Sequence, residues 1–285
     1  MEIEGKSVQM RRKRKTLQEM VYVMLMLVAI IVMFQWYTAQ NTIRMEERNK
    51  SYASDSTKQM AGRIDENFEN ALDSINMYTF FIGGSLTKPE ITTQMLKNLE
   101  ESSIFDVVVY TDLQGMNHSS DGRTSDAAGR DYYVNGIQGE KGISVVFDSE
   151  FYDETMLCFY APVRFDGEII GVMRGAYLAE EYLKDMLSTT YFGEEASTHL
   201  CMPDGSVIAC SDNKAHRGNL ISLLVDMNMI DPDTAEKTRE VFENGGEGAF
   251  ICSPGSATDN ICVRYLPGKE LVLVQAFPKS VTQRM

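Results

Sequence analysis

The longest apolar run of the chain lies near its N-terminus. Fourteen consecutive residues, Val21–Phe34, include no charged, amide, serine or threonine side chain. The wider segment Leu17–Ala39 is interrupted only by Gln18, Glu19, Gln35 and Thr38. A helix of this length is about 34 Å long, slightly more than the hydrocarbon core of a bilayer at about 30 Å. The pattern therefore predicts a transmembrane helix over residues 17–39.

The residues on either side of this helix predict its orientation. Five consecutive basic residues, Arg11–Lys15, precede it, and Trp36 and Tyr37 lie at its other end, where an interfacial aromatic belt is expected. Because basic flanking residues stay on the cytoplasmic side, residues 1–16 are predicted to be a cytoplasmic basic tail. Residues 40–285 are then extracytoplasmic.

A cleaved signal peptide is the main alternative for residues 17–39. Such a peptide has a shorter apolar region and small residues before its cleavage site, whereas this chain has Tyr37 there. A buried core helix fits less well, because the adjacent basic cluster would have no access to water. The sequence therefore favours an uncleaved, single-pass membrane anchor.

The next segment, residues 40–84, is predicted to form one long stalk helix. In its second half, apolar side chains recur mostly every three or four residues, at Ile64, Phe68, Ala71, Leu72, Ile75, Tyr78 and Ile82. Its first half is polar, as expected for a helix in water, and Gly83-Gly84 ends the pattern. A shorter helix is predicted over Thr87–Ser102, with Pro89 in its first turn.

After residue 102 the pattern changes to short strands rich in β-branched and aromatic residues, separated by turns that contain Gly and Asp. The predicted strands are 105–111, 143–147, 156–163 and 168–178, followed by 198–202, 207–211, 247–253, 261–266 and 270–277. Both groups follow the same order of strand, turn, middle section, hairpin and final strand. The fold class predicted is α+β, with a transmembrane helix, a stalk helix and two antiparallel-sheet subdomains in series, over residues 85–190 and 191–280.

Charge and composition narrow the possible functions. The chain has 27 basic and 41 acidic residues, a net charge of −14, and outside its first nineteen residues the balance is more acidic still. This balance argues against a nucleic-acid partner. No nucleophile elbow, phosphate loop, metalloprotease helix or catalytic carboxylate pair is present. Neither an enzymatic activity nor a cofactor is therefore predicted.

The histidines and cysteines do not predict a metal site. The candidates His199, Cys201, Cys210 and His216 lack the spacing of any standard zinc site. Cys252 and Cys262 flank a predicted hairpin almost symmetrically. A cross-strand disulfide and two separate core thiols are both open for this pair.

The segment Asn117–Gly142 is long and polar and contains five glycines. Such a segment inside a compact unit is predicted to be a binding loop or disordered. It carries Arg130, Tyr132 and Tyr133, a combination that could hold a carboxylate on the guanidinium with aromatic rings packed over the ligand. A surface arginine beside two tyrosines that cover the sheet edge is the alternative.

Five segments carry a resemblance to a known family: Gly129–Tyr133, Ile143–Phe147, Ala161–Val163, Asp166-Gly167 and Gly171–Tyr177. In this order they resemble the double Cache domain, a pair of PAS-like sheets that forms the extracytoplasmic sensor of bacterial chemoreceptors, histidine kinases and diguanylate cyclases. The resemblance covers about residues 40–280. It implies that residues 85–190 are the membrane-distal subdomain with the ligand pocket and residues 191–280 the membrane-proximal one. It also implies that the ligand moves the stalk helix.

The resemblance points to further ligand-contacting positions. In the amino-acid-binding branch of the family, two acidic residues grip the ligand's ammonium group, and Asn135 and Ala176 stand at those positions here. Phe147 stands where a tyrosine is usual. An ammonium group buried without a counter-charge is strongly disfavoured. The expected ligand is therefore a carboxylate or a neutral heterocycle rather than an α-amino acid.

Arg174 is a further candidate because of strand alternation. It lies two residues from both Ala176 and Val172, so the three side chains share one face of the strand. On that face it would supply a second contact for an anion. The alternative is a half-exposed arginine that pairs with Glu168 or Asp166.

Taken together, these patterns predict a membrane-anchored extracytoplasmic sensor that binds a small molecule and transmits the signal through its helix. The 285 residues include no output module and no second membrane span, so the expectation is the N-terminal part of a longer receptor. A homodimer through the stalk and transmembrane helices is expected, because a helical lever is read most easily as motion between two copies. The alternatives are a membrane-tethered cell-surface hydrolase, which the missing catalytic residues disfavour, and an adhesion or scaffold protein.

Overall fold

The computed structural model describes residues 2–147, 149, 154–188, 190–191, 194–211, 218–252, 256 and 258–278. Within these, only the backbone is described for residues 2–19, 21, 190–191, 194–195 and 259. The chain forms two compact units, Met1–Ser51 and Tyr52–Met285. The second unit contains both sheets.

Helix α1 (Glu2–Gly83) runs without interruption through both predicted helical segments. Among the residues whose side chains are described, one helix is long and apolar enough to cross a membrane, and its apolar window, which lies in this N-terminal region, is unburied. The helix ends where the glycine pair predicts, with the Gly84 N–H donating to the Phe80 carbonyl at 2.9 Å. The boundary predicted between residues 39 and 40 is not marked by any break in the helix.

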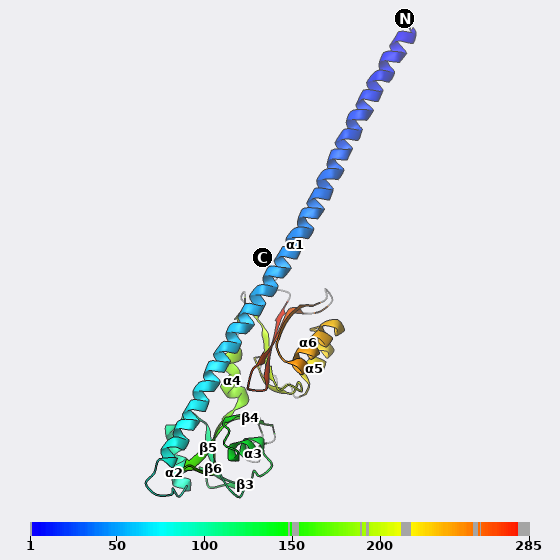
Figure 1. Cartoon of the computed structure of the whole chain (residues 1–285). Helices are drawn as coiled ribbons and strands as arrows, with labels where there is room; N and C mark the ends of the chain where they lie inside the picture. Colours follow the sequence, from blue (N-terminus) through cyan, green and yellow to red (C-terminus); the bar gives the residue numbers. More distant parts are fainter. Residues whose placement is uncertain are drawn as a thin grey trace. The chain divides into compact units, whose positions relative to one another are not determined.

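The first sheet has six antiparallel strands in the order β3-β2-β1-β6-β5-β4. They are β1 (Val107–Asp112), β2 (Met116–Ser119), β3 (Thr124–Asp126), β4 (Gly142–Val146), β5 (Met156–Phe165) and β6 (Glu168–Leu178). Helix α1 and the short α2 (Thr93–Ser102) pack on one face, and α3 (Asp131–Ile137) packs on the other (Figure 1). Because side chains alternate along each strand, the strands β5 and β6 contribute to the cores on both faces.

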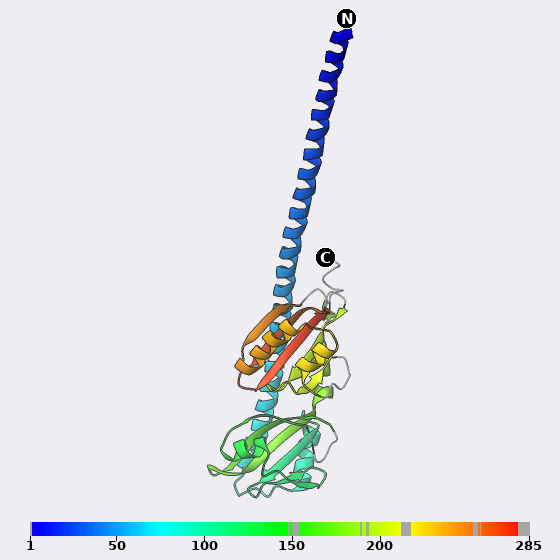
Figure 2. The same ribbon diagram turned by 90° about the vertical axis from the view of Figure 1, so that its right-hand side faces the viewer.

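The second sheet has five antiparallel strands in the order β10-β9-β13-β12-β11. They are β9 (Ser197–Cys201), β10 (Val207–Cys210), β11 (Glu247–Ile251), β12 (Thr258–Leu266) and β13 (Leu271–Pro278). Helices α5 (Leu220–Asp226) and α6 (Pro232–Asn244) cover the face opposite α1. In the sequence, α4 (Ala179–Leu187) and the short pair β7 (Thr190–Tyr191) and β8 (Glu194–Glu195) connect the strands of the first sheet to those of the second. Figure 2 shows the two sheets one after the other beside the second part of α1.

One continuous core joins α1 to both sheets. Its fully buried members include Met60 and Ile64 on α1, Leu157 in the first sheet and Leu200 and Leu273 in the second. Its centre is a group of five aromatic side chains, called the aromatic cluster below: Phe68, Phe105, Phe159, Tyr177 and Tyr182. The rings of Tyr177 and Tyr182 stack with centroids 3.9 Å apart, and burial raises the pKa of Tyr182 to about 12. Helix α1 is therefore packed against the strands of both sheets.

The architecture confirms the predicted α+β class, and three local predictions are corrected. Helix α2 begins at Thr93 rather than Thr87, because the Thr92 hydroxyl accepts the Met95 N–H and caps the helix there. Residues 117–142 are not a structureless loop, since they contain most of β2, all of β3 and α3, and the start of β4. The helix α4, whose buried face includes Leu183 and Leu187, was not predicted.

The five cysteines are all buried thiols. Cys252 belongs to the core under α5 and α6, whereas Cys262 packs with Ala53 and Phe277 on the α1 side. In the strand register, Cys262 lies opposite Ala249. The two cysteines therefore occupy opposite faces of the second sheet, which resolves the open alternative in favour of separate core thiols.

Candidate ligand-binding site

A small cavity lies on the α3 face of the first sheet and is called the α3 cavity below. Its lining residues are Asn117, Ser125, Asp126, Arg130, Tyr132, Val146, Ser149 and Arg174. The space open to water is about 10 Å³, which is room for roughly one water molecule. A larger molecule fits only if the lining side chains move. Two of the lining residues carry positive charge and one, Asp126, is a carboxylate.

Arg174 forms the floor of this cavity. It projects from the middle of β6 and is only 7% exposed. Its guanidinium carbon lies 4.6 Å from the centroid of the Tyr132 ring, and Nη1 lies 3.3 Å from the sulfur of Cys158. Arg174 is therefore buried. It is not the half-exposed arginine, paired with Glu168 or Asp166, that the sequence left open as the alternative. Burial also raises the pKa of Tyr132, and the positive charge of Arg174 partly offsets that effect.

The Tyr132 ring is held in place from the other side by Asn117. The Asn117 side-chain amide donates to the Tyr132 hydroxyl at 3.1 Å and to the Ser125 hydroxyl at 3.0 Å. Its carbonyl oxygen accepts from the Thr111 hydroxyl at 2.7 Å. Three strands and the helix α3 are thus tied together by one buried amide, which fixes the ring that covers Arg174.

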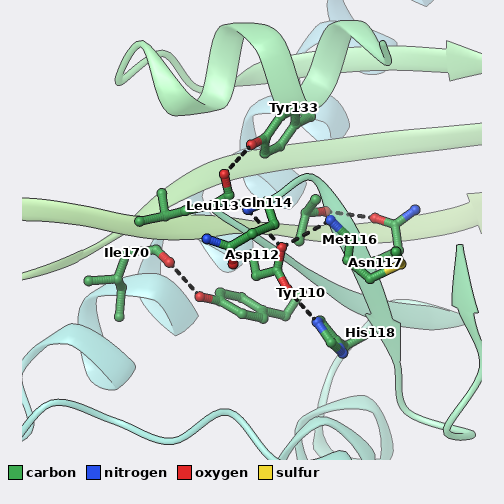
Figure 3. A network of polar contacts seen from close by, with 10 residues as sticks. Tyr110, Asp112, Leu113, Gln114, Met116, Asn117, His118, Tyr133 and Ile170 are labelled. Carbon is green, nitrogen blue, oxygen red and sulfur yellow. Dashed lines mark hydrogen bonds and ion pairs between the residues drawn. The ribbon is translucent and has the colours of Figure 1, made fainter. Parts of the chain in front are cut away.

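Arg130 reaches the cavity from the N-cap position of α3. The chain is extended at Arg130 and turns helical at Asp131, so Tyr132 and Tyr133 fall in the first turn and are both buried. Tyr133 points away from the cavity, because its hydroxyl donates to the Leu113 carbonyl at 3.0 Å (Figure 3). It supports the β1–β2 turn rather than the cavity wall.

The other predicted contact residues lie near the cavity without lining it. Asn135 hydrogen-bonds the Tyr160 hydroxyl. Phe147 follows β4 and is 40% exposed, and Ala176 is buried beside Cys158 in the α3-side core. Arg130, Tyr132 and Arg174 are therefore the predicted residues that the fold brings to one cavity.

Sequence reasoning missed the five other lining residues, Asn117, Ser125, Asp126, Val146 and Ser149. Asn117, Ser125 and Asp126 lie on β2 and β3, which were predicted to be loop. The buried positions of β2, Asn117 and Ser119, are polar and its apolar residue Met116 is exposed, so the sequence of this strand carries no apolar alternation that would have identified it.

A network of polar contacts pins the turn between β1 and β2 (Figure 3). Asp112 Oδ1 accepts the N–H groups of Gln114 and Met116 at 2.9 and 3.0 Å, and Oδ2 lies 2.8 Å from His118 Nε2. Partial burial acts to raise the pKa of Asp112, but these hydrogen bonds outweigh it and hold the pKa below its usual value of 3.8. The network adjoins Asn117, so it supports one wall of the α3 cavity.

The lowered pKa predicts a pH dependence of stability. Asp112 stabilises the fold fully above about pH 3.8, and this contribution is lost as the pH falls through the lower folded-state pKa. Asp112→Asn should lower the unfolding temperature at about pH 6, and this difference should shrink progressively as the pH falls below about 3.8 and the carboxyl becomes protonated, first in the unfolded and then in the folded state. The exposed Asp226 provides the control, since Asp226→Asn should change little over the same pH range. A difference for Asp112→Asn that grows on acidification would contradict the prediction.

The described residues show no group of three His, Cys, Asp or Glu side chains that could hold a metal ion. His199 lies opposite Cys210 in the strand register, and His216 lies outside the described residues. Burial raises the pKa of the Cys201 thiol, which keeps it protonated and disfavours it as a metal ligand.

The arrangement of the two sheets on one helix is shared with solved structures. The extracellular domain of the putative histidine kinase rpHK1S-Z16 matches with a TM-score of 0.63 and 14% identity, over 83% of this chain and 97% of that one. The chain has the fold of Cache-type extracytoplasmic sensor domains. This fold confirms the resemblance that the sequence motifs carry. No protein-family model and no curated protein matches the chain.

Chemoreceptor sensor domains share the Cache fold with this chain. The ligand-binding domain of Campylobacter jejuni Tlp3, solved with L-valine, matches with a TM-score of 0.62 and 14% identity, over 85% of this chain and 97% of that one. The ligand-binding domain of the Pseudomonas aeruginosa amino acid chemoreceptor PctC, solved with GABA, matches with a TM-score of 0.59 and 16% identity, over 81% of this chain and all of that one. These neighbours are sensory ligand-binding domains.

Proposed function

We propose that this protein is a membrane-anchored extracytoplasmic sensor whose ligand binds in the α3 cavity. The observation that carries the proposal is the convergence of Arg130, Tyr132 and Arg174 on one cavity within a Cache-type fold. Burying the charge of an arginine in a core costs free energy. The presence of Arg174 under an aromatic ring therefore favours a role such as anion recognition.

The charges of the cavity favour an anionic ligand. Arg130 and Arg174 outweigh Asp126, which leaves the lining with net positive charge. The two solved chemoreceptor domains hold L-valine and GABA, which carry an ammonium group as well as a carboxylate. Here Asn135 and Ala176 supply no carboxylate, and the two arginines outnumber Asp126, so we propose a compact carboxylate, with a neutral heterocycle as the second choice.

The fold offers a route from the cavity to α1. Cys158 and Arg174 lie on the α3 side of the first sheet, whereas their neighbours in sequence, Phe159 and Met173, lie on the α1 side. A ligand that displaces β5 or β6 therefore displaces the aromatic cluster, and with it the contact between Phe68 of α1 and Phe159, whose ring centroids are 5.6 Å apart. We propose that this displacement is the signal.

The second sheet also holds α1. Lys269, in the turn between β12 and β13, pairs with Asp65 at 3.0 Å and with Glu69 at 2.5 Å. On the face of the sheet directed toward α1, Gln275 donates to the Thr198 hydroxyl at 3.2 Å, while its Oε1 has no hydrogen-bond partner among the described residues. The Lys269 ion pairs are polar contacts between the second sheet and α1, whereas the Gln275–Thr198 hydrogen bond lies within the sheet.

Removing the Arg130 guanidinium should weaken ligand binding without unfolding the protein. A thermal-shift screen of the full chain against small carboxylates, heterocycles and amino acids should find a few related compounds that stabilise it. Arg130→Ala should then lower the affinity for those compounds by roughly ten- to hundred-fold, the loss of one charge-assisted contact of about 1.5–3 kcal/mol. Arg123→Ala, an exposed arginine before β3, is the control. A tight α-amino-acid ligand, or unchanged affinity in Arg130→Ala, would contradict the proposed ligand class.

The orientation and the homodimer are proposed from the basic tail and the stalk, and one set of variants tests both. Single cysteines placed at the exposed positions of residues 43–64 should react with a membrane-impermeant maleimide on intact cells, whereas a cysteine in residues 1–16 should not. Under mild oxidation, cross-linking along residues 43–64 should follow a helical period of about 3.6 residues. Labelling of the N-terminal tail would show that the orientation is the reverse of the one proposed. Cross-linking without a helical period would argue against a parallel helix pair.

A further inference from the structure

A second cavity lies between the end of α1 and the β5–β6 hairpin and is called the hairpin groove below. It shares no lining residue with the α3 cavity. Its volume is about 450 Å³, within the range of about 300–1,000 Å³ of small-molecule sites. Three segments form its wall, namely the last two turns of α1, the residues just after α3, and the hairpin itself.

Two glycines set Arg164 into the wall of this groove. A Cβ on Gly83 would lie 1.8 Å from the Arg164 carbonyl oxygen, and a Cβ on Gly139 would lie 2.5 Å from the Arg164 Nη2. At Gly83 the neighbouring atom is backbone, so only glycine permits this approach, and Gly139 has a φ of +94°, a conformation that favours glycine. The guanidinium is held further by a hydrogen bond from Nη1 to the Gly167 carbonyl at 3.4 Å. Arg164 is thus an exposed but positioned cation.

The charge of the groove is opposite to that of the whole protein. The chain carries a net charge of −14, yet Arg164 and Lys141 in the groove outnumber its single carboxylate, Asp166. Lys141 lies 3.6 Å from Asp73, while no carboxylate among the described residues forms an ion pair with Arg164. The groove therefore favours a small anion over a cation.

An exposed aromatic ring completes the groove. Phe80 lines it and is 76% exposed, and the neighbouring Phe81 is 68% exposed with its ring edge-on to Phe80 at 6.3 Å. We propose that the hairpin groove binds a compact aromatic carboxylate, with the carboxylate on Arg164 beside Lys141 and the ring packed on Phe80. This would be a ligand site separate from the α3 cavity, on the same helix α1.

Calorimetric titration of the full chain in detergent with phenylacetate tests this site, with benzamide as a neutral probe of similar shape. Phenylacetate should bind saturably at one site, and benzamide should bind much more weakly. Arg164→Gln should weaken phenylacetate binding about tenfold or more, and Phe80→Ala should weaken it several-fold. Arg239→Gln on α6 and Arg130→Ala in the α3 cavity should leave phenylacetate binding unchanged. The experiment therefore tests the hairpin groove independently of the proposed sensing site in the α3 cavity. Both groove side chains are exposed, and thermal unfolding should confirm that the variants fold.

Several results would overturn the proposal. One is the lack of saturable phenylacetate binding up to about 20 mM. A second is an affinity that Arg164→Gln leaves unchanged, and a third is a loss in Arg130→Ala, which would place phenylacetate in the α3 cavity. A fourth is a Phe80→Ala variant that alters self-association but not phenylacetate binding, because the exposed rings would then serve contact between chains.

Discussion

Replacing Arg174 with methionine should nearly abolish binding of the proposed carboxylate. Arg174 is almost fully buried, so its contact with an anion is shielded from water and is stronger than that of the half-buried Arg130. Loss of one partner of a buried charge pair typically costs about 2–5 kcal/mol, which is about thirtyfold or more in Kd. Titration of Arg174→Met with the best compound from the thermal-shift screen measures this loss.

Two further variants separate charge from shape at this position. Arg174→Lys keeps the positive charge but loses the planar fork that matches a carboxylate and stacks on Tyr132, so it should restore binding only in part. Arg239→Met, on the surface of α6, should leave the affinity unchanged. Full binding by Arg174→Met would show that the ligand does not reach the floor of the α3 cavity.

Truncating Phe159 to alanine should cause the largest loss of stability. Its side chain is fully buried, and it contacts the rings of Phe68, Phe105, Tyr177 and Tyr182. Phenylalanine-to-alanine changes in such cores cost about 3–5 kcal/mol, because transfer free energy is lost and a cavity remains. Denaturant unfolding of the full chain measures the change in the free energy of unfolding.

The exposed Phe81 on α1 provides the matched control for this experiment. Phe81→Ala removes the same atoms from a side chain that is 68% exposed, so it should shift the free energy of unfolding by less than about 0.5 kcal/mol. Phe159→Leu keeps most of the volume and should remain folded, which allows ligand response and stability to be measured in the same variant. A loss below about 1 kcal/mol in Phe159→Ala would mean that the aromatic cluster does not hold α1 to the first sheet.

Local chemistry was enough to predict most of the elements. Gly83-Gly84 predicted the end of α1, and Asp166-Gly167 predicted the hairpin, where both residues adopt positive φ. Strand β6 runs over the predicted residues 168–178. These features depend on a few adjacent residues, so they can be predicted from the sequence without knowledge of the tertiary contacts.

The α3 cavity depends on contacts between residues far apart in the sequence. Asn117 reaches Tyr132, fifteen residues away, and Arg174 lies 42 residues beyond Tyr132 in the sequence. Strand alternation correctly placed Arg174 on the same face as Ala176, but it could not show whether that face was covered. The cover is supplied by α3, a helix of seven residues in a segment whose glycines predicted a loop.

The burial of every thiol has a practical consequence for chemical labelling. None of the five cysteines is more than 6% exposed, so maleimides and other electrophiles have little access to them in the folded protein. Fluorophores and spin labels can therefore be attached through added surface cysteines without first mutating the native ones. Distance measurements between such labels on α1 and on the first sheet become possible in the unaltered core.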